Sequence, residues 1–174
     1  MNIELIKWPT EDDWIMAKRC ALVTVGKDSD TAPTEDWKRR SLEARHSYIR
    51  ELQFVFRITG IPYWVAMHLV RHHVGCQPYI KTQRNDRQKI YDRGDAPQNT
   101  PVDMMWSMNA EAFMTIANKR LCKLAAMETR KVVITMCRLA LLRCPEFTGM
   151  FVPACEYHGG KCYEMQPCGR RNNK

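Results

Sequence analysis

The sequence of 174 residues predicts an α+β fold, a mixed sheet packed against helices. Two segments alternate apolar and polar residues, as strands do, and several others repeat apolar residues at helical spacing behind residues that favour helix N-termini. Neither an internal repeat nor a low-complexity segment divides the chain. We therefore expect a single domain over residues 1–174, with a cysteine-rich tail at about residues 150–174.

The first third of the chain predicts one strand and two helices. Apolar and polar residues alternate over residues 2–8, which indicates a strand. Thr10 is followed by acidic residues, a helix N-cap pattern that predicts a helix over about residues 11–22. Thr34 is the next cap, and the helix that it begins is expected to end near His46.

The clearest strand is ELQFVFRIT, residues 51–59, which places apolar side chains on one face and stops at Gly60. Pro62 then favours a helix N-terminus, because its fixed φ suits the first turn. Apolar residues continue at helical spacing from there to Arg71 or beyond. The chain is expected to leave this helix near Gly75.

Residues 85–103 are polar and contain glycine and prolines, so they are expected to form a surface loop. Two helices rich in Met, Ala and Leu are expected after it, over about residues 105–124 and 127–144. Their methionines are interpreted as core packing, because Met is a flexible filler of apolar cores.

Composition narrows the class of protein. Apolar residues make up 45% and charged residues 26%, as in globular proteins. The longest uncharged runs, such as residues 58–67, are too short for the roughly 20 residues of a membrane span. The N-terminal residues lack the layout of a secretory signal, so we expect a cytoplasmic protein whose eight cysteines stay reduced.

A basic stretch, RHHVGCQPYIKTQRNDRQ, covers residues 71–88 and is either a solvated loop or an anion site. The net charge of +8 is consistent with phosphate binding. Because the basic residues are scattered along the chain, they favour small anions over nucleic acid. His68, His72 and Cys76 would share one face of a continuous helix, which leaves a metal site as an alternative.

Several blocks in the same order resemble the flavin-dependent thymidylate synthases, the ThyX family, which methylate deoxyuridylate with methylenetetrahydrofolate and a bound FAD as hydride carrier. HLVRHH at residues 68–73 resembles the family's Q-L-x-R-H-R signature. HSYIRELQFVFRI at residues 46–58 resembles the histidine-bearing segment and strand before it. MNAEAFMTIANKRLCKLAAMETR at residues 108–130 resembles the family's pair of helices.

The chain departs from the family pattern at several positions. His73 replaces the last arginine of the signature, and Lys81 stands where the pattern counts to a serine. One inserted residue would align Thr82 with that serine and Arg84 with the following arginine. Glu111 replaces the arginine after Asn-Ala. The region between the signature and the last helices is also shorter than in the family. The family has a further nucleotide-binding arginine there, and Arg93 is the only nearby candidate for it in this chain.

The resemblance implies a site rich in guanidinium and imidazole groups, which form strong contacts with phosphate. The residues that it assigns to FAD are His46, Arg71, His72, His73 and Asn109. Those that it assigns to dUMP are His68, Lys81, Thr82, Arg84 and Arg120. Among them, Thr82, Arg84 and Arg120 are the catalytic candidates. NADPH and methylenetetrahydrofolate would be co-substrates, in a homotetramer whose sites are shared between subunits and which binds no metal.

Two other functions fit the sequence. The first is a nucleotide-binding protein of the same fold, or an enzyme that makes another modification at uracil C5, such as hydroxymethylation. The second is a basic nucleic-acid-binding protein whose tail binds zinc. The candidate zinc ligands would be Cys155, His158, Cys162 and Cys168, although their spacing is wider than in common zinc motifs.

Overall fold

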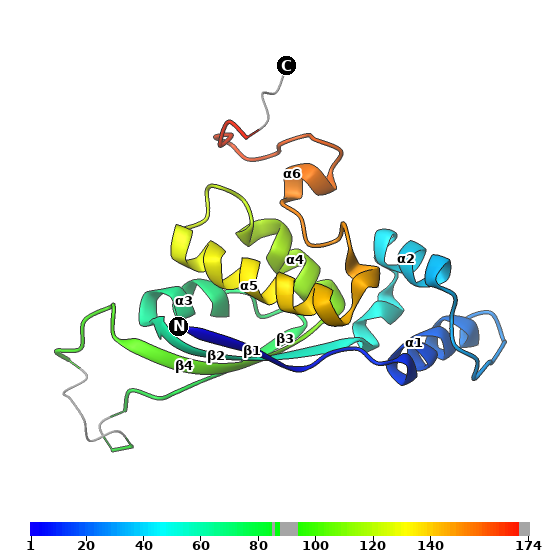
Figure 1. Ribbon diagram of the computed structural model, residues 1–174, viewed down its shortest axis with the longest axis horizontal. Helices are drawn as coiled ribbons and strands as arrows, with labels where there is room; N and C mark the ends of the chain where they lie inside the picture. Colours follow the sequence, from blue (N-terminus) through cyan, green and yellow to red (C-terminus); the bar gives the residue numbers. More distant parts are fainter. Residues whose placement is uncertain (85, 88–93, 171–174) are drawn as a thin grey trace.

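The computed structural model describes residues 1–84, 86–87 and 94–170. The described part of the chain contains a four-stranded antiparallel sheet in the order β1-β2-β4-β3, with α3, α4 and α5 over one of its faces (Figure 1). The strands are β1 (Asn2–Lys7), β2 (Gln53–Pro62), β3 (Cys76–Ile80) and β4 (Pro101–Asn109). The helices are α1 (Glu11–Val23), α2 (Glu35–Glu43), α3 (Tyr63–Val70), α4 (Ala110–Arg120), α5 (Met127–Arg143) and α6 (Ala154–Tyr157). Short 3-10 helices cover Ser47–Glu51 and Pro145–Phe147. The predicted α+β class is confirmed.

The predicted helix caps are confirmed in the N-terminal part of the chain. The Thr10 hydroxyl accepts a hydrogen bond from the backbone N–H of Asp13, whose carboxylate accepts one from the backbone N–H of Thr10 at 2.8 Å. This reciprocal pair satisfies backbone donors that the first turn of α1 leaves free. Thr34 caps α2 by accepting from the backbone N–H of Trp37 at 3.2 Å.

The region around β4 corrects the sequence prediction. Residues 101–109 form a central strand between β2 and β3, whereas they were expected to end a loop and begin a helix. Val102, Met104, Trp106 and Met108 alternate as buried residues along it, which is the period of a strand with one face on the core. Richness in methionine suggested a helix, but the alternation decides the structure. The strand β3 was not among the predicted elements.

The end of α3 also differs from expectation. The helix ends at Val70, one residue before the basic stretch begins, so His68, His72 and Cys76 do not share a helical face. The Sγ of Cys76 instead donates to the carbonyl oxygen of His72 at 2.8 Å. The helical arrangement behind the metal alternative is therefore wrong.

A cluster of phenylalanines fixes α4 on the sheet. The Phe113 ring meets Phe54 and Phe56 of β2 edge to face, with centroids 5.2 and 5.3 Å apart, and lies 4.4 Å from Phe151. Phe54, Phe56 and Phe113 are fully buried. Burial of such a side chain contributes about 1.5–3 kcal/mol, so these contacts hold α4 against β2.

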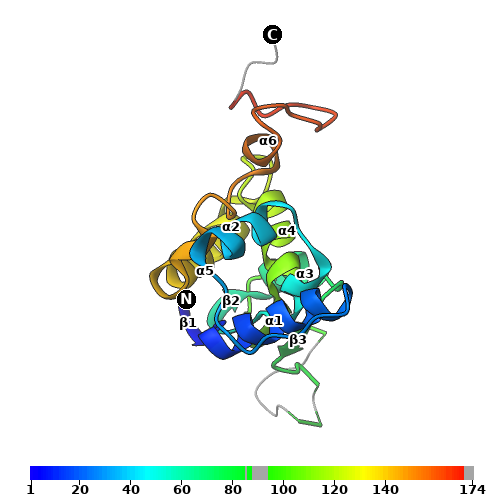
Figure 2. The same ribbon diagram turned by 90° about the vertical axis from the view of Figure 1, so that its right-hand side faces the viewer.

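Residues 158–170 of the C-terminal tail stand away from the sheet, and residues 81–84 and 94–100 extend beyond one end of the sheet (Figures 1 and 2). Arg93 lies outside the described residues. Within the described residues, no helix is both long and apolar enough to cross a membrane.

Candidate functional site

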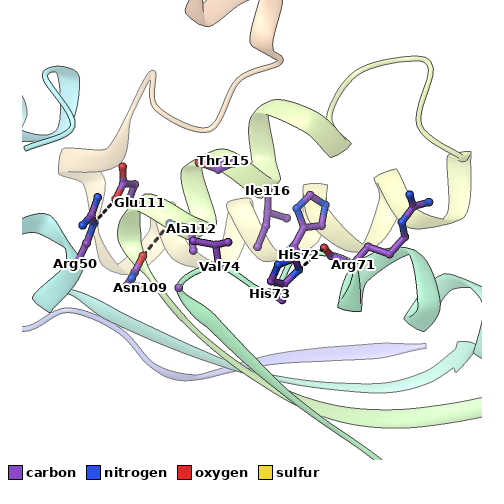
Figure 3. A pocket seen from close by; sticks show the side chains of 11 residues that line it. Arg50, Arg71, His72, His73, Val74, Asn109, Glu111, Ala112, Thr115 and Ile116 are labelled. Atoms are coloured by element: carbon purple, nitrogen blue, oxygen red, sulfur yellow. Dashed lines mark hydrogen bonds and ion pairs between the residues drawn. The ribbon is translucent and has the colours of Figure 1, made fainter. Parts of the chain in front are cut away.

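A cavity of about 560 Å³ opens where the turn after α3, the end of β4 and the start of α4 meet (Figure 3). It brings together Arg50 and two blocks of sequence, residues 71–75 and 109–116. Four of the five residues expected to bind flavin line it. The lining residues are Arg50, Arg71, His72, His73, Val74, Gly75, Asn109, Glu111, Ala112, Thr115 and Ile116.

Gly75 and Asn109 connect the two walls of the cavity. The backbone N–H of Asn109 donates to the carbonyl oxygen of Gly75 at 2.9 Å. Gly75 has φ of +71°, and a Cβ there would lie 2.7 Å from the Asn109 Nδ2. Because only glycine allows both the positive φ and this close approach, the turn after α3 can pack directly on the cap of α4.

Asn109 also begins α4. Its Oδ1 accepts from the backbone N–H of Ala112 at 2.9 Å, as an N-cap residue does. Among the described residues, its Nδ2 has no hydrogen-bond partner. The amide can therefore donate to a ligand in the cavity while its oxygen holds the helix.

Arg120 and His72 form a hydrogen-bonded pair beside the cavity. The Nε of Arg120 donates to the Nε2 of His72 at 2.9 Å, and its Nη2 donates to the carbonyl oxygen of His68 at 2.7 Å. Because the Nε2 accepts, a neutral His72 carries its proton on Nδ1. The last turn of α4 is thus tied to the end of α3.

The electrostatics of this pair keep His72 neutral. Burial, and next the charges of Arg120 and Arg71, lower the pKa of His72 to about 4. Burial and the charge of Arg71 lower the pKa of Arg120 as well. Several cations therefore lie close to a neutral imidazole, an arrangement that an anion would stabilise.

A second hollow of about 460 Å³ shares Arg71 and His72 with the cavity. Lys119, Arg120, Cys122 and Glu164 are among its other lining residues. Among the described residues, no carboxylate forms an ion pair with Arg71 or Arg120, and the Lys119 ammonium lies 3.8 Å from Glu164. We call this second space the basic hollow.

An ion pair between Arg50 and Glu111 lies at the opposite side of the cavity from Arg71 (Figure 3). The Arg50 Nε donates to the Glu111 carboxylate at 2.5 Å. The sequence analysis noted Glu111 only as a departure from the family pattern and missed Arg50 entirely. Arg50 lies at the site because its 3-10 helix is beside the start of α4. No residue pattern in the sequence predicts that contact.

His46 does not line the cavity, although Arg50, which does, follows only four residues later in the chain. It caps the 3-10 helix, is exposed, and stacks on Tyr48 with ring centroids 5.3 Å apart. Tyr48 in turn stacks on Trp37 of α2. In the single chain, His46 is therefore the one expected flavin residue outside the cavity.

His68 lies on α3, and its Nδ1 is 3.2 Å from the Thr129 Oγ1 of α5. It contributes its backbone carbonyl to the site, where it accepts from Arg120. The interpretation of its imidazole as a substrate ligand remains a prediction.

Lys81, Thr82 and Arg84 lie beyond the far end of β3. Cys76, at the near end of this strand, pairs with Met108, whereas Ile80 pairs with Met104. The strand thus leads away from the cavity before it reaches the three residues. Arg84 forms an ion pair with Asp86 at 2.7 Å, and the Thr82 hydroxyl accepts from the backbone N–H of Arg84. A single chain does not bring them to Arg120.

The described residues contain no group of three or more His, Cys, Asp or Glu side chains that could hold a metal ion. Cys155, His158, Cys162 and Cys168, the candidate zinc ligands of the tail, do line one small cavity.

Comparison with known proteins confirms the resemblance seen in the sequence. A family model described as thymidylate synthase complementing protein (Thy1) matches residues 91–146. A crystal structure of Thymidylate Synthase X (ThyX) from Helicobacter pylori with FAD and dUMP has a TM-score of 0.66 at 13% identity, covering 87% of this chain and 97% of that chain. Another ThyX structure from the same organism, complexed with FAD and dUMP, has a TM-score of 0.66 at 14% identity, covering 87% and 98%. No curated protein matched the sequence. The chain therefore has the ThyX fold.

Proposed function

We propose that the protein is a cytoplasmic, single-domain flavin-dependent thymidylate synthase, which converts dUMP to dTMP with methylenetetrahydrofolate, NADPH and bound FAD. The observation that carries the proposal is the convergence of Arg71, His72, His73 and Asn109 on one cavity, directly beside Arg120. The match of residues 91–146 to the Thy1 model and the fold shared with ThyX proteins that bind FAD and dUMP support it.

The residues around the cavity fit part of a flavin. Its volume is in the range of about 300–1,000 Å³ common for ligand sites. Val74, Ala112 and Ile116 supply apolar surface for a flat ring, and the Asn109 Nδ2 is a donor without a partner in the described part of the chain. Arg71 can pair with a phosphate, while Arg50 neutralises the one carboxylate of the wall, Glu111.

FAD, when bound, would supply the hydride chemistry of the reaction. The chain's own residues would bind and orient the ligands. Arg71 and Arg120 would stabilise negative charge that develops on the pyrimidine, because fixed cations in a partly buried site act strongly on such charge. His72 stays neutral beside them and can donate through Nδ1, so it can orient a ligand without adding repulsion.

We propose that His46, Lys81, Thr82 and Arg84 act in the site of another subunit of a homotetramer. The support is their position: all four are on the outside of the single chain, and the last three lie beyond the far end of β3. Co-expression of Arg120→Ala with Arg84→Ala tests this sharing. Each variant alone should have reduced activity at low dUMP concentration, and mixed tetramers should recover part of the activity at sites built from one intact half of each chain. Absence of any recovery would contradict a shared site.

The proposed activity is tested with dUMP tritiated at C5. Protein loaded with FAD and supplied with methylenetetrahydrofolate and NADPH should release tritium to water and form dTMP. Arg71→Ala should reduce the rate strongly, whereas Arg138→Ala removes an equal charge from an exposed position on α5 and should not. Flavin-loaded wild-type protein that releases no tritium would refute the proposal.

A second candidate function is another modification at uracil C5, such as hydroxymethylation, or nucleotide binding without catalysis. Glu111 favours it, because a carboxylate faces the cavity where the family pattern has an arginine. Mass spectrometry of the nucleotide product separates these outcomes, since a hydroxymethyl product carries one more oxygen than dTMP. Nucleotide recovered unchanged, with binding intact, would support a binding protein.

A further inference from the structure

Four cysteines from separate segments surround a small cavity of about 140 Å³ at the base of the tail. Cys122 comes from the loop between α4 and α5, Cys155 from α6, and Cys162 and Cys168 from the tail. Nothing in the proposed synthase reaction uses them. None of the four lines the candidate flavin cavity.

Cys122 and Cys168 line the same small cavity. They lie close enough for each thiol to affect the pKa of the other, and the backbone N–H groups of Arg170 and Lys123 also act on the Cys168 thiol. Lys123 follows Cys122 in the loop, so the loop backbone itself positions the tail cysteine. Both cysteines are partly exposed, and a small oxidant can therefore reach them.

The environments of the two sulfurs differ in a way that suits a nucleophile and a resolving thiol. The backbone N–H of Arg170, and then the bonds from Cys122 and Lys123, lower the pKa of the Cys168 thiol. Burial raises the pKa of the Cys122 thiol. Cys168 is therefore the more readily ionised partner, and the thiolate is the reactive form of cysteine.

Cysteines in the core provide the contrast. Burial raises the pKa of both Cys137 and Cys144 to about 12, and both are enclosed by the helices and the sheet. Such thiols are inert at neutral pH. We therefore expect oxidants to react with Cys122 and Cys168 before the core cysteines, because of where these two residues lie in the fold.

We propose that Cys122 and Cys168 form a reversible dithiol–disulfide pair, which fastens the C-terminal tail to the loop between α4 and α5. With hydrogen peroxide as the oxidant, the Cys168 thiolate attacks one peroxide oxygen and the O–O bond breaks, which leaves a sulfenic acid and a hydroxide that takes up the proton lost by the Cys168 thiol and becomes water. The Cys122 sulfur then attacks the sulfenic sulfur, the S–O bond breaks, and the departing hydroxide takes the Cys122 thiol proton and leaves as a second water. Two thiols lose two electrons in total, and the peroxide gains them.

The disulfide would hold the tail next to the basic hollow. Cys122 and Glu164 line this hollow together with Arg71 and Arg120, and Glu164 lies 3.8 Å from the Lys119 ammonium. Fastening Cys168 therefore keeps a tail carboxylate beside these cations. The link itself does not depend on the proposed synthase activity, so its test and the tritium assay can fail separately.

Peptide mapping tests the pairing. Reduced, metal-free, full-length protein is treated with one equivalent of hydrogen peroxide, alkylated and digested with trypsin without reductant. The expected product is LCK (residues 121–123) linked to CYEMQPCGR (residues 162–170), and dithiothreitol should reverse it. Because Cys162 shares the second peptide, Cys162→Ser is the matched control and should keep the link, whereas Cys168→Ser should abolish it.

A link that persists in Cys168→Ser would overturn the pairing, as would free alkylation of Cys122 and Cys168 after oxidation. Stoichiometric zinc that shields these thiols from peroxide would also overturn it. Hydrogen exchange gives an independent measurement on the wild-type chain. Amides of residues 161–170 should exchange more slowly after oxidation, and unchanged rates would contradict the fastening of the tail.

Discussion

The wall of the cavity is held differently from two peripheral segments, the residues after β3 and the C-terminal tail. Gly75, Asn109 and His72 are fixed by backbone and side-chain contacts to α3, β4 and α4, which rest on the buried phenylalanines. Arg84 at the far end of β3 and Cys168 in the tail are attached by exposed contacts of few residues. The core therefore pre-forms half of the candidate site, and the remainder depends on a neighbouring subunit or on the state of the tail.

The largest effect on stability should come from the support beneath the cavity. Phe113→Ala removes a fully buried ring from the contacts with Phe54, Phe56 and Phe151. We expect a loss of about 3–5 kcal/mol in the free energy of unfolding, measured by urea denaturation. Leu142→Ala is the control, because this side chain is 79% exposed and its loss should change stability by less than about 0.5 kcal/mol. Equal effects would contradict the account of the core.

The second largest loss of stability is expected at Gly75, where the two walls of the cavity meet. Gly75→Ala places a methyl 2.7 Å from the Asn109 Nδ2 at a φ of +71°. Gly26→Ala is the matched control, with φ of +67° and no atom within 4 Å of the added Cβ. Both variants carry the strain of a positive φ, about 1–2 kcal/mol. Only Gly75→Ala should be destabilised further and lose FAD binding, as thermal melting and flavin fluorescence can measure.

His72 gives the stability of the cavity a pH dependence. Its pKa is lowered to about 4 in the folded protein from an ordinary value of 6.5, so the unfolded chain binds a proton first as pH falls. The stability due to this group is complete above pH 6.5 and is lost progressively between pH 6.5 and about 4.

The variant Arg120→Met tests the cause of that shift. Removing the guanidinium removes a repulsion of the imidazolium, so the pKa of His72 should rise in an NMR titration of its ring protons. Lys119→Met should raise it less, because Lys119 is the smallest of the charges that act on His72. A larger shift in Lys119→Met would mean that the pair between Arg120 and His72 does not set the titration.

The same division explains what the sequence could predict. Thr10 and Thr34 predict the starts of their helices, because a cap is a local hydrogen bond. The alternation in residues 53–58 predicts β2. Residues 101–109 do not follow the prediction, because three methionines and alanine-rich neighbours favour a helix although the alternation of a strand is equally regular. Four flavin candidates did converge, since they lie on elements that the core orders. Arg50 could not be found, because its contact with Glu111 joins segments with no shared pattern.

Arg84 should show the smallest effect on stability and a separate effect on binding. Its ion pair with Asp86 is exposed on both sides, with 62% and 55% of the side chains accessible, and such pairs contribute about 0–1 kcal/mol. Arg84→Ala should therefore leave the unfolding free energy almost unchanged. In the proposed tetramer it should nevertheless weaken dUMP binding by about 1 kcal/mol or more, measured by calorimetry, because a charged hydrogen bond to phosphate is lost.

Asp86→Ala breaks the same ion pair but keeps the guanidinium, so it should bind dUMP at least as well as the wild type. Unchanged affinity in Arg84→Ala would remove Arg84 from the site and leave the cavity beside Arg120 as its only part.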